Sequence, residues 1–422
     1  MTQAHTTHHI DWKTRLRAMG PGIMMASAAV GGSHIIASTQ AGALYGWQLA
    51  LLIVLVNLFK YPFFRFGPQY TLETGKSLIE GYADKGRAYL WVFFILNLFA
   101  TVINTAAVAM LCAAILGYIL PVGLSMNGLS IAVLISTTLI LLIGPYRAVD
   151  SLSKWIMISL TITTVAAVAI AASRGAVMQP DFIEPSPWNM GALAFIVALM
   201  GWMPAPIEIS AINSLWVSAK RKLEKVSYED GIFDFNVGYI STAILAIVFL
   251  ALGALVQYGS GTELKMAGGA YIGQLTDMYA ATIGEWSRFL VTFIAFACMY
   301  GTTLTVVDGY SRSNMEALRL ILRREEVKSS NRQFMIWVIA AALSGMAVIL
   351  FFKGAVMVML KFAMIASFVS TPIFAYLNLS LAIKGKHNHA VQPWLLWLAY
   401  IGLVFLTGFT LLFLAQMSGL LQ

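Results

Sequence analysis

A short run of small and polar residues interrupts the first long apolar segment of this chain. The segment covers residues 20–46, and Gly31, Gly32, Ser33 and His34 lie near its middle. Two adjacent glycines weaken a helix, because glycine loses more backbone freedom on ordering than any other residue. Backbone groups freed from helical hydrogen bonds inside a membrane are tolerated only where protein covers them or where they line a cavity. The run therefore predicts a broken membrane helix with a binding site at the break.

A second interruption lies in a later apolar segment, residues 190–216, where prolines occupy positions 204 and 206. Interrupted helices in two parts of a membrane protein are the sequence signal for a transporter's substrate site. We therefore expect both breaks to line one cavity. The residues that the second break contributes to the predicted site are Met200, Gly201, Met203, Ala205 and Glu208.

Three side chains at the breaks could ligate a metal ion, and each has a structural alternative. The imidazole of His34 could bind a metal or a proton, or it could hydrogen-bond carbonyls freed by the break. The thioether of Met203 suits soft metals, although methionine also fills gaps in cores and the chain has 21 of them. Glu208 could ligate a cation or carry a proton, or it could anchor unwound backbone.

Three further residues are candidates for a gate or an ion pathway. Asp308 and Arg312 are four residues apart and so share one face of a helix. An ion pair that closes the inner end of the protein is the favoured interpretation of these two. Asn104, like Thr101 and Thr105 beside it, is expected to hydrogen-bond between helices rather than to bind a ligand.

The elements that must position these residues are membrane helices. Of the 422 residues, 59% are hydrophobic and 11% charged, and the mean hydropathy is +0.78. Soluble domains contain about 25% charged residues, so this composition predicts an all-α polytopic membrane protein. A span needs about 20 apolar residues. Eleven segments meet this length, at roughly 20–44, 47–67, 89–118, 127–145, 151–172, 190–216, 235–257, 284–310, 333–352, 355–383 and 392–417.

The distribution of lysine and arginine predicts the orientation of these spans. The basic residues concentrate in alternate loops, which the positive-inside rule assigns to the cytoplasm. The tail of residues 1–19 is then cytoplasmic, and an odd number of spans places Gln422 outside. The net charge of +8 is explained by this topology without a nucleic-acid partner. The expected location is the inner (plasma) membrane of a bacterium.

The positions of the breaks also predict an internal repeat. Spans 1–5 and spans 6–10 each begin with a broken helix, which is the arrangement of a five-plus-five inverted repeat. The repeats would cover residues 20–172 and 190–383 within a ten-helix core at 20–388. Residues 389–422 would add an eleventh helix.

The residues around the breaks resemble those of a known family. Gly20-Pro21-Gly22-Ile23, Ala26-Ser27-Ala28, Gln40-Ala41-Gly42-Ala43 and Tyr45-Gly46 are similar to the first span of the Nramp metal-ion transporters. Met203-Pro204 resembles the start of the Met-Pro-His motif in the sixth span of that family. The resemblance implies a LeuT-like fold with a substrate site between broken helices 1 and 6.

The chain departs from that family at the residues that bind metal. Gly31-Gly32-Ser33-His34 stands where the family has Asp-Pro-Gly-Asn, so its metal-binding aspartate corresponds to Gly31. The histidine of the Met-Pro-His motif corresponds to Ala205. The third span also lacks the acidic residues that the family links to proton transfer. The resemblance therefore implies the fold and transport more strongly than it implies metal binding or proton coupling.

These observations predict a secondary transporter and leave its substrate class open. The leading expectation is a divalent cation, with hydrated Mg²⁺ favoured over Mn²⁺ or Fe²⁺, because Mg²⁺ dehydrates reluctantly and this site lacks the family's aspartate. Weak or absent proton coupling is expected. The alternative is a small organic solute, since Gly31 and Gly32 leave the site larger and without negative charge. A channel or non-transporting sensor is a third possibility. No enzyme activity, cofactor or ATPase subunit is expected, and the partners are the transported species and the lipid bilayer.

Overall fold

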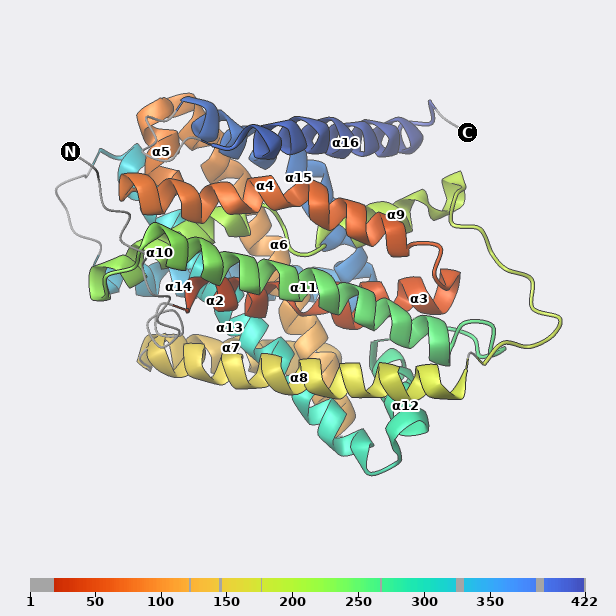
Figure 1. Ribbon diagram of the computed structural model, residues 1–422. Helices are drawn as coiled ribbons and strands as arrows, with labels where there is room; N and C mark the ends of the chain where they lie inside the picture. The colour runs from red at the N-terminus through yellow and green to blue at the C-terminus, as the bar shows by residue number, and fades with distance from the viewer. Residues whose placement is uncertain are drawn as a thin grey trace, which may run out of the picture.

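The computed structural model describes residues 19–120, 123–143, 146–175, 177–265, 268–323, 330–384 and 391–420. Within these ranges every regular element is a helix, and long helices lie side by side in one bundle (Figure 1). In chain order they are α2 (Pro21–Ala29), the π-helix η1 (Ser33–Ser38), α3 (Thr39–Tyr45), α4 (Ala50–Thr74), α5 (Leu78–Lys85), α6 (Arg87–Ile119), α7 (Met126–Ile143), α8 (Tyr146–Arg174), α9 (Met190–Gly201), α10 (Ile209–Leu223), α11 (Tyr228–Val256), α12 (Gly268–Ile283), α13 (Ser287–Ile321), α14 (Asn331–Phe352), α15 (Val356–Lys384) and α16 (Pro393–Met417).

Eight of the described helices are individually long and apolar enough to cross a membrane. They are α4, α6, α7, α11, α13, α14, α15 and α16. The other three predicted spans correspond to α2 with η1 and α3, to α8, and to α9 with α10. The all-helical fold with broken first and sixth spans is confirmed. The division into repeats and an eleventh helix stays a prediction, and nearly all of the 1–19 tail lies outside the described residues.

Some helices run beyond the predicted spans. The span expected to end at residue 310 continues as α13 to Ile321, and the acid–base pairs Asp308–Arg312 and Glu316–Arg319 lie along this extension. Acid–base pairs three or four residues apart lie on one face of a helix and stabilise it. The short helix α5 lies between two predicted spans and begins with a capping box, in which Ser77 and Glu80 satisfy each other's backbone N–H groups.

Helix α11 packs along both halves of the broken first span, α2 and α3 (Figure 1). Glycines on both sides make this approach possible. A Cβ on Gly238 would lie 2.2 Å from the carbonyl oxygen of Gly22, and a Cβ on Gly253 would lie 2.1 Å from that of Thr39. Gly42 similarly faces the carbonyl of Leu250. Small residues allow membrane helices to approach this closely, so α11 holds both half-helices in line on either side of the break.

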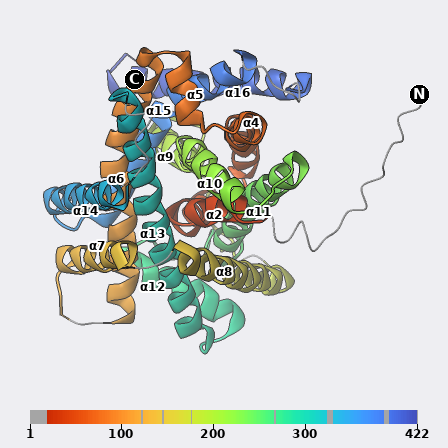
Figure 2. The same ribbon diagram turned by 90° about the vertical axis from the view of Figure 1, so that its left-hand side faces the viewer.

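Helices α6 and α13 cross the molecule together (Figure 2) and share a polar seam. Asn314 of α13 donates to the hydroxyl of Thr101 at 2.7 Å, and Asn104 of α6 donates to the hydroxyl of Tyr310 at 2.6 Å. Thr101 and Asn104 therefore make the interhelical hydrogen bonds expected of them. The hydroxyl of Thr105 has no partner among the described residues.

Candidate functional site

The first span breaks at the predicted glycines. Helix α2 ends at Ala29, and the carbonyl of Gly31 accepts hydrogen bonds from the N–H groups of His34 and Ile35 as the chain becomes helical again. In the described residues, neither Gly31 nor Gly32 donates a backbone hydrogen bond from its own N–H. The break therefore leaves two backbone donors at the depth of the membrane.

The sixth span breaks between Gly201, the last residue of α9, and Ile209, the first residue of α10. The peptide bond between Met203 and Pro204 is cis. Gly201 is required by packing, since a Cβ there would lie 1.9 Å from the carbonyl oxygen of Met364 on α15.

A cavity of about 30 Å³ lies between the two breaks, which is room for roughly two water molecules. Four of the predicted site residues line it, namely Gly31, Gly32, Ser33 and Asn104. Its other walls come from α2, the second break, α6, α10 and α13. No lining residue is charged. The lining residues outside the prediction are Ala28, Ala29, Val108, Trp202, Pro206, Ile209, Thr302, Val306 and Tyr310.

The imidazole of His34 is buried against α11 and does not line this cavity. Its Nε2 donates to the carbonyl of Thr242 at 2.9 Å, and its Nδ1 lies 2.7 Å from the hydroxyl of Ser33. The ring meets Phe249 edge-on, with 6.3 Å between centroids. Both ring nitrogens thus have partners within the protein, but the carbonyl that Nε2 binds belongs to α11, whereas the structural alternative for His34 expected a carbonyl of the break. Its role as a metal ligand stays a prediction.

The carboxylate of Glu208 is buried at the start of α10, behind Tyr310 and Asn104. Its Oε1 accepts from the Tyr310 hydroxyl at 2.9 Å and lies 3.4 Å from the amide of Asn104. The second oxygen, Oε2, and the carbonyl oxygen of the Asn104 side chain have no hydrogen-bond partner among the described residues. Two acceptor oxygens are therefore left unsatisfied beside the cavity.

Lys60, in the middle of α4, is a charged residue at the second break that was not among the predicted site residues. Its ammonium is buried and donates to the carbonyls of Met200 at 2.7 Å, Gly201 at 3.0 Å and Ala205 at 3.4 Å. A lysine inside the second apolar span was the available signal, because ionisable residues at membrane depth are rare and usually functional. Carbonyls that a bound cation could use at this break are thus occupied by a cation of the protein itself.

The charges at the second break match the dipoles of its two half-helices. The C-terminal end of a helix carries about half a negative charge and the N-terminal end about half a positive one. Lys60 lies at the C-terminal end of α9, and Glu208 at the N-terminal end of α10. The two side chains carry charges of opposite sign at the same break. The break is therefore balanced in charge without a bound ion.

The predicted metal ligands do not form a compact acidic or histidine site. No group of three or more His, Cys, Asp or Glu residues in the described ranges could hold a metal ion together. Met203 is fully buried in the core and is absent from the cavity lining. Metal binding by His34, Met203 and Glu208 stays a prediction.

The predicted gate residues Asp308 and Arg312 form an ion pair. Two nitrogens of the guanidinium each lie 2.8 Å from a carboxylate oxygen, and the guanidinium also covers the ring of Phe334 at 4.4 Å. The ion pair is confirmed, whereas a role in gating stays a prediction.

Comparison with known proteins identifies the family and the fold of this chain. Residues 22–416 match the model of the family described as natural resistance-associated macrophage protein-like, Nramp. The fold and the two breaks define a membrane transporter of the LeuT-like class, and the chain belongs to the Nramp family. It is also 64% identical over 414 residues to the uncharacterized protein PM0681 of Pasteurella multocida (strain Pm70), covering 97% of this chain and 95% of that protein.

Solved structures share the fold at low sequence identity. A mutant of the manganese transporter of Eremococcus coleocola matches with a TM-score of 0.74 at 13% identity, covering 96% of this chain and 87% of that one. The structure of MhsT in complex with L-phenylalanine matches with a TM-score of 0.56 at 12% identity, covering 92% and 98%. The shared scaffold thus carries a metal transporter and a protein that binds an amino acid.

Proposed function

We propose that this chain is a secondary transporter of a small organic solute without net positive charge. The observation that carries the proposal is Lys60, whose ammonium occupies the carbonyls of Met200, Gly201 and Ala205. A divalent cation at those carbonyls would have to displace a buried lysine and then lie beside its charge. Glu208, the acidic side chain beside the cavity, does not line it, and its negative charge is already balanced by Lys60.

The second candidate substrate is a hydrated divalent cation, with Mg²⁺ favoured over Mn²⁺ or Fe²⁺. It is favoured by the two unsatisfied oxygens, Oε2 of Glu208 and the side-chain carbonyl of Asn104. Oxygen ligands suit hard cations, which keep several of their waters. The manganese transporter of the same fold supports transport of metals on this scaffold.

Thermal unfolding of the purified full-length protein tests the choice between these candidates. The midpoint is measured with MnCl₂, with MgCl₂ and with a panel of carboxylic acids, amino acids and amides. We expect a panel member, and neither metal, to raise the midpoint in a saturable way and to be taken up by proteoliposomes. Saturable stabilisation by Mg²⁺, with no effect of any panel member, would overturn the proposal in favour of the second candidate.

Substitution of Lys60 tests whether its buried charge is the reason that a metal cation is excluded from the cavity. In Lys60→Met the buried carbonyls lose their cation, so we expect the free energy of unfolding to fall by roughly 3 kcal/mol. Adding Gly31→Asp should then give measurable Mn²⁺ binding by calorimetry, whereas Gly31→Asp alone should not. Lys361→Met, at an exposed position on α15, is the matched control. Equal Mn²⁺ affinity with and without Lys60 would show that this lysine does not exclude metal.

A further inference from the structure

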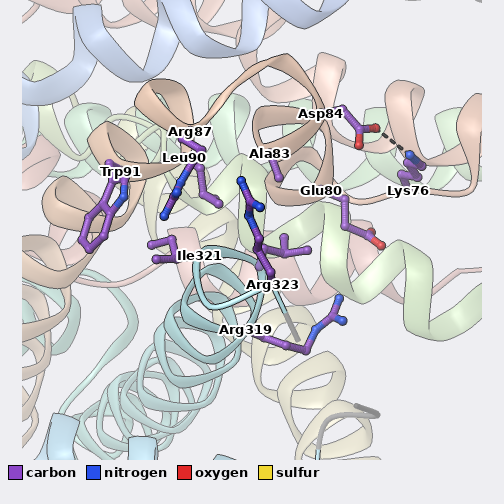
Figure 3. A pocket seen from close by; sticks show the side chains of 11 residues that line it. Lys76, Glu80, Ala83, Asp84, Arg87, Leu90, Trp91, Arg319, Ile321 and Arg323 are labelled. Atoms are coloured by element: carbon purple, nitrogen blue, oxygen red, sulfur yellow. Dashed lines mark hydrogen bonds and ion pairs between the residues drawn. The ribbon is translucent and has the colours of Figure 1, made fainter. Parts of the chain in front are cut away.

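A pocket of about 390 Å³ lies at one end of the bundle, where α5, the start of α6 and the end of α13 meet (Figure 3). It shares no lining residue with the central cavity between the two breaks. Its lining combines four basic residues with two acidic ones and the indole of Trp91. The charged lining residues are Lys76, Glu80, Asp84, Arg87, Arg319 and Arg323.

Both acidic residues of this pocket already have partners. Asp84 pairs with Lys76 at 2.6 Å, and Glu80 accepts from the backbone and hydroxyl of Ser77 in the capping box. Arg319 is paired with Glu316 on its own helix at 2.7 Å. The carboxylate of Asp84 is therefore engaged by another lining residue, and Oε2 of Glu80 is engaged by the capping box.

Two arginines of the pocket have guanidinium groups that are not paired within the described residues. In the part of the chain that the structure describes, the guanidinium groups of Arg87 and Arg323 make no hydrogen bond or ion pair. Figure 3 shows both side chains directed into the space between α6 and the turn after α13. Like charges that face one gap repel each other, and a bound anion removes that repulsion. Arg323 also has a φ of 53°, a left-handed conformation that is uncommon outside glycine and is retained where the surroundings impose it.

The position of the pocket indicates the chemistry of the anion. Trp91, at its edge, is 41% exposed on the outer surface of α6, and the apolar side chains of Val92 and Ile95 continue that exposed surface. Tryptophan is enriched where membrane proteins meet lipid headgroups. The planar fork of arginine matches phosphate oxygens in pairs, and basic pockets between helices at this level suit anionic headgroups.

We propose that this pocket is a binding site for a phosphate-bearing group held between Arg87 and Arg323. The phosphate could belong to the headgroup of an anionic phospholipid or to a soluble phosphate compound, and the two sources offer the same oxygens to the arginines. The proposal does not depend on the substrate of the central cavity.

The test uses full-length protein in detergent and compares it with the double variant Arg87→Gln/Arg323→Gln. Native mass spectrometry and thermal unfolding are measured with phosphatidylglycerol, with phosphatidylcholine and with inorganic phosphate. We expect phosphatidylglycerol to bind the wild type on the order of thirtyfold more tightly than it binds the double variant, since each of the two arginines near a headgroup contributes about 1 kcal/mol. Phosphatidylcholine should not distinguish the two proteins.

Two comparisons keep the test decisive. Lys222→Gln/Lys225→Gln removes two exposed charges outside the pocket and should bind the lipid like the wild type. Arg87→Lys/Arg323→Lys keeps the charge but loses the paired geometry and should be intermediate. Binding of inorganic phosphate that depends on the arginines, without any preference for phosphatidylglycerol, would support the site and assign it to a soluble compound. Equal binding of all probes by the wild type and the double variant would overturn the proposal.

Discussion

The two glycines of the first break differ in their surroundings. A Cβ on Gly31 would lie 3.3 Å from the sulfur of Met299 and 3.4 Å from Thr302, within reach of a small movement by the flexible methionine. A Cβ on Gly32 would lie 2.8 Å from the ring of Trp202, whose indole N–H donates to Ser367 at 3.1 Å. The second glycine therefore fixes the wall of the cavity, and the first leaves room for a side chain.

Alanine substitutions should separate these two positions. Gly31→Ala should retain most solute-dependent thermal stabilisation, because its methyl group needs a shift of only a few tenths of an ångström. Gly32→Ala should lower the affinity for the solute about tenfold or more, and the thermal stabilisation should fall with it. The indole of Trp202 would have to break its hydrogen bond to Ser367 and move into the cavity. The measurement is titration of each variant with the solute that stabilises the wild type. Equal losses in both variants would contradict the assignment of Trp202 to the cavity wall.

At the scale of the elements, the breaks depend on helices that are themselves continuous. Helix α4 brings Lys60 to the end of α9, and α11 braces α2 and α3 through the glycine contacts described above. Asp234 of α11 also accepts hydrogen bonds from the backbone N–H groups of Gly20 and Gly22 at the start of α2. A carboxylate at the start of α2 accepts from backbone N–H groups that have no partner within the helix, and its negative charge complements the positive end of the helix dipole.

Methyl groups on the α11 glycines should therefore destabilise the protein. Gly238→Ala and Gly253→Ala would each place a Cβ about 2 Å from the backbone of the first span, and we expect each to lower the free energy of unfolding by about 2 kcal/mol. The matched control is Gly408→Ala on α16, where no atom of another helix lies within 4 Å of the new methyl group. That variant should be neutral or more stable by up to about 1 kcal/mol. Thermal unfolding in one detergent compares all three, and an equal response of the three would refute the packing argument.

At the scale of the whole molecule, the predicted orientation in the membrane places one end of the bundle in the cytoplasm and the other end outside. Helix α16 ends at the opposite end of the bundle from α5 (Figure 1). A membrane-impermeant maleimide applied to intact cells should label Leu420→Cys, which is 79% exposed, and should not label Lys222→Cys until the membrane is permeabilised. The native Cys112 and Cys298 are buried and give little background. Labelling of Lys222→Cys from outside would reverse the orientation.

The coupling of transport to protons is a second property of the whole transporter. The third span carries Asn104 and Thr105, with no acidic side chain between residues 100 and 105. Uptake by proteoliposomes, followed with an internal pH dye, should therefore proceed with little substrate-dependent acidification. Acidification equal to that caused by a proton-coupled Nramp transporter would contradict this expectation, and its loss in Glu208→Gln would then identify the carrier.

Much of the fold follows from the sequence, because it depends on composition and local pattern. Long apolar segments must become helices to satisfy their backbone in lipid. The glycines at 31 and 32 and the prolines at 204 and 206 weaken the helix wherever they occur, so both breaks were predictable. The same locality explains the predicted pair Asp308–Arg312, whose partners lie one helical turn apart.

Which side chains and carbonyls lie at the two breaks was decided by the tertiary structure. Whether His34 faces the cavity or α11 depends on the rotation of a half-helix, and α11 supplies the carbonyl of Thr242 from 208 residues away. Lys60 reaches the carbonyl of Met200 across 140 residues of sequence. Spacing along the chain cannot predict such contacts, because they exist only once separate helices pack together. The sequence by itself determined that the chain has two broken helices, and the packing of α4 and α11 determined which groups occupy the breaks.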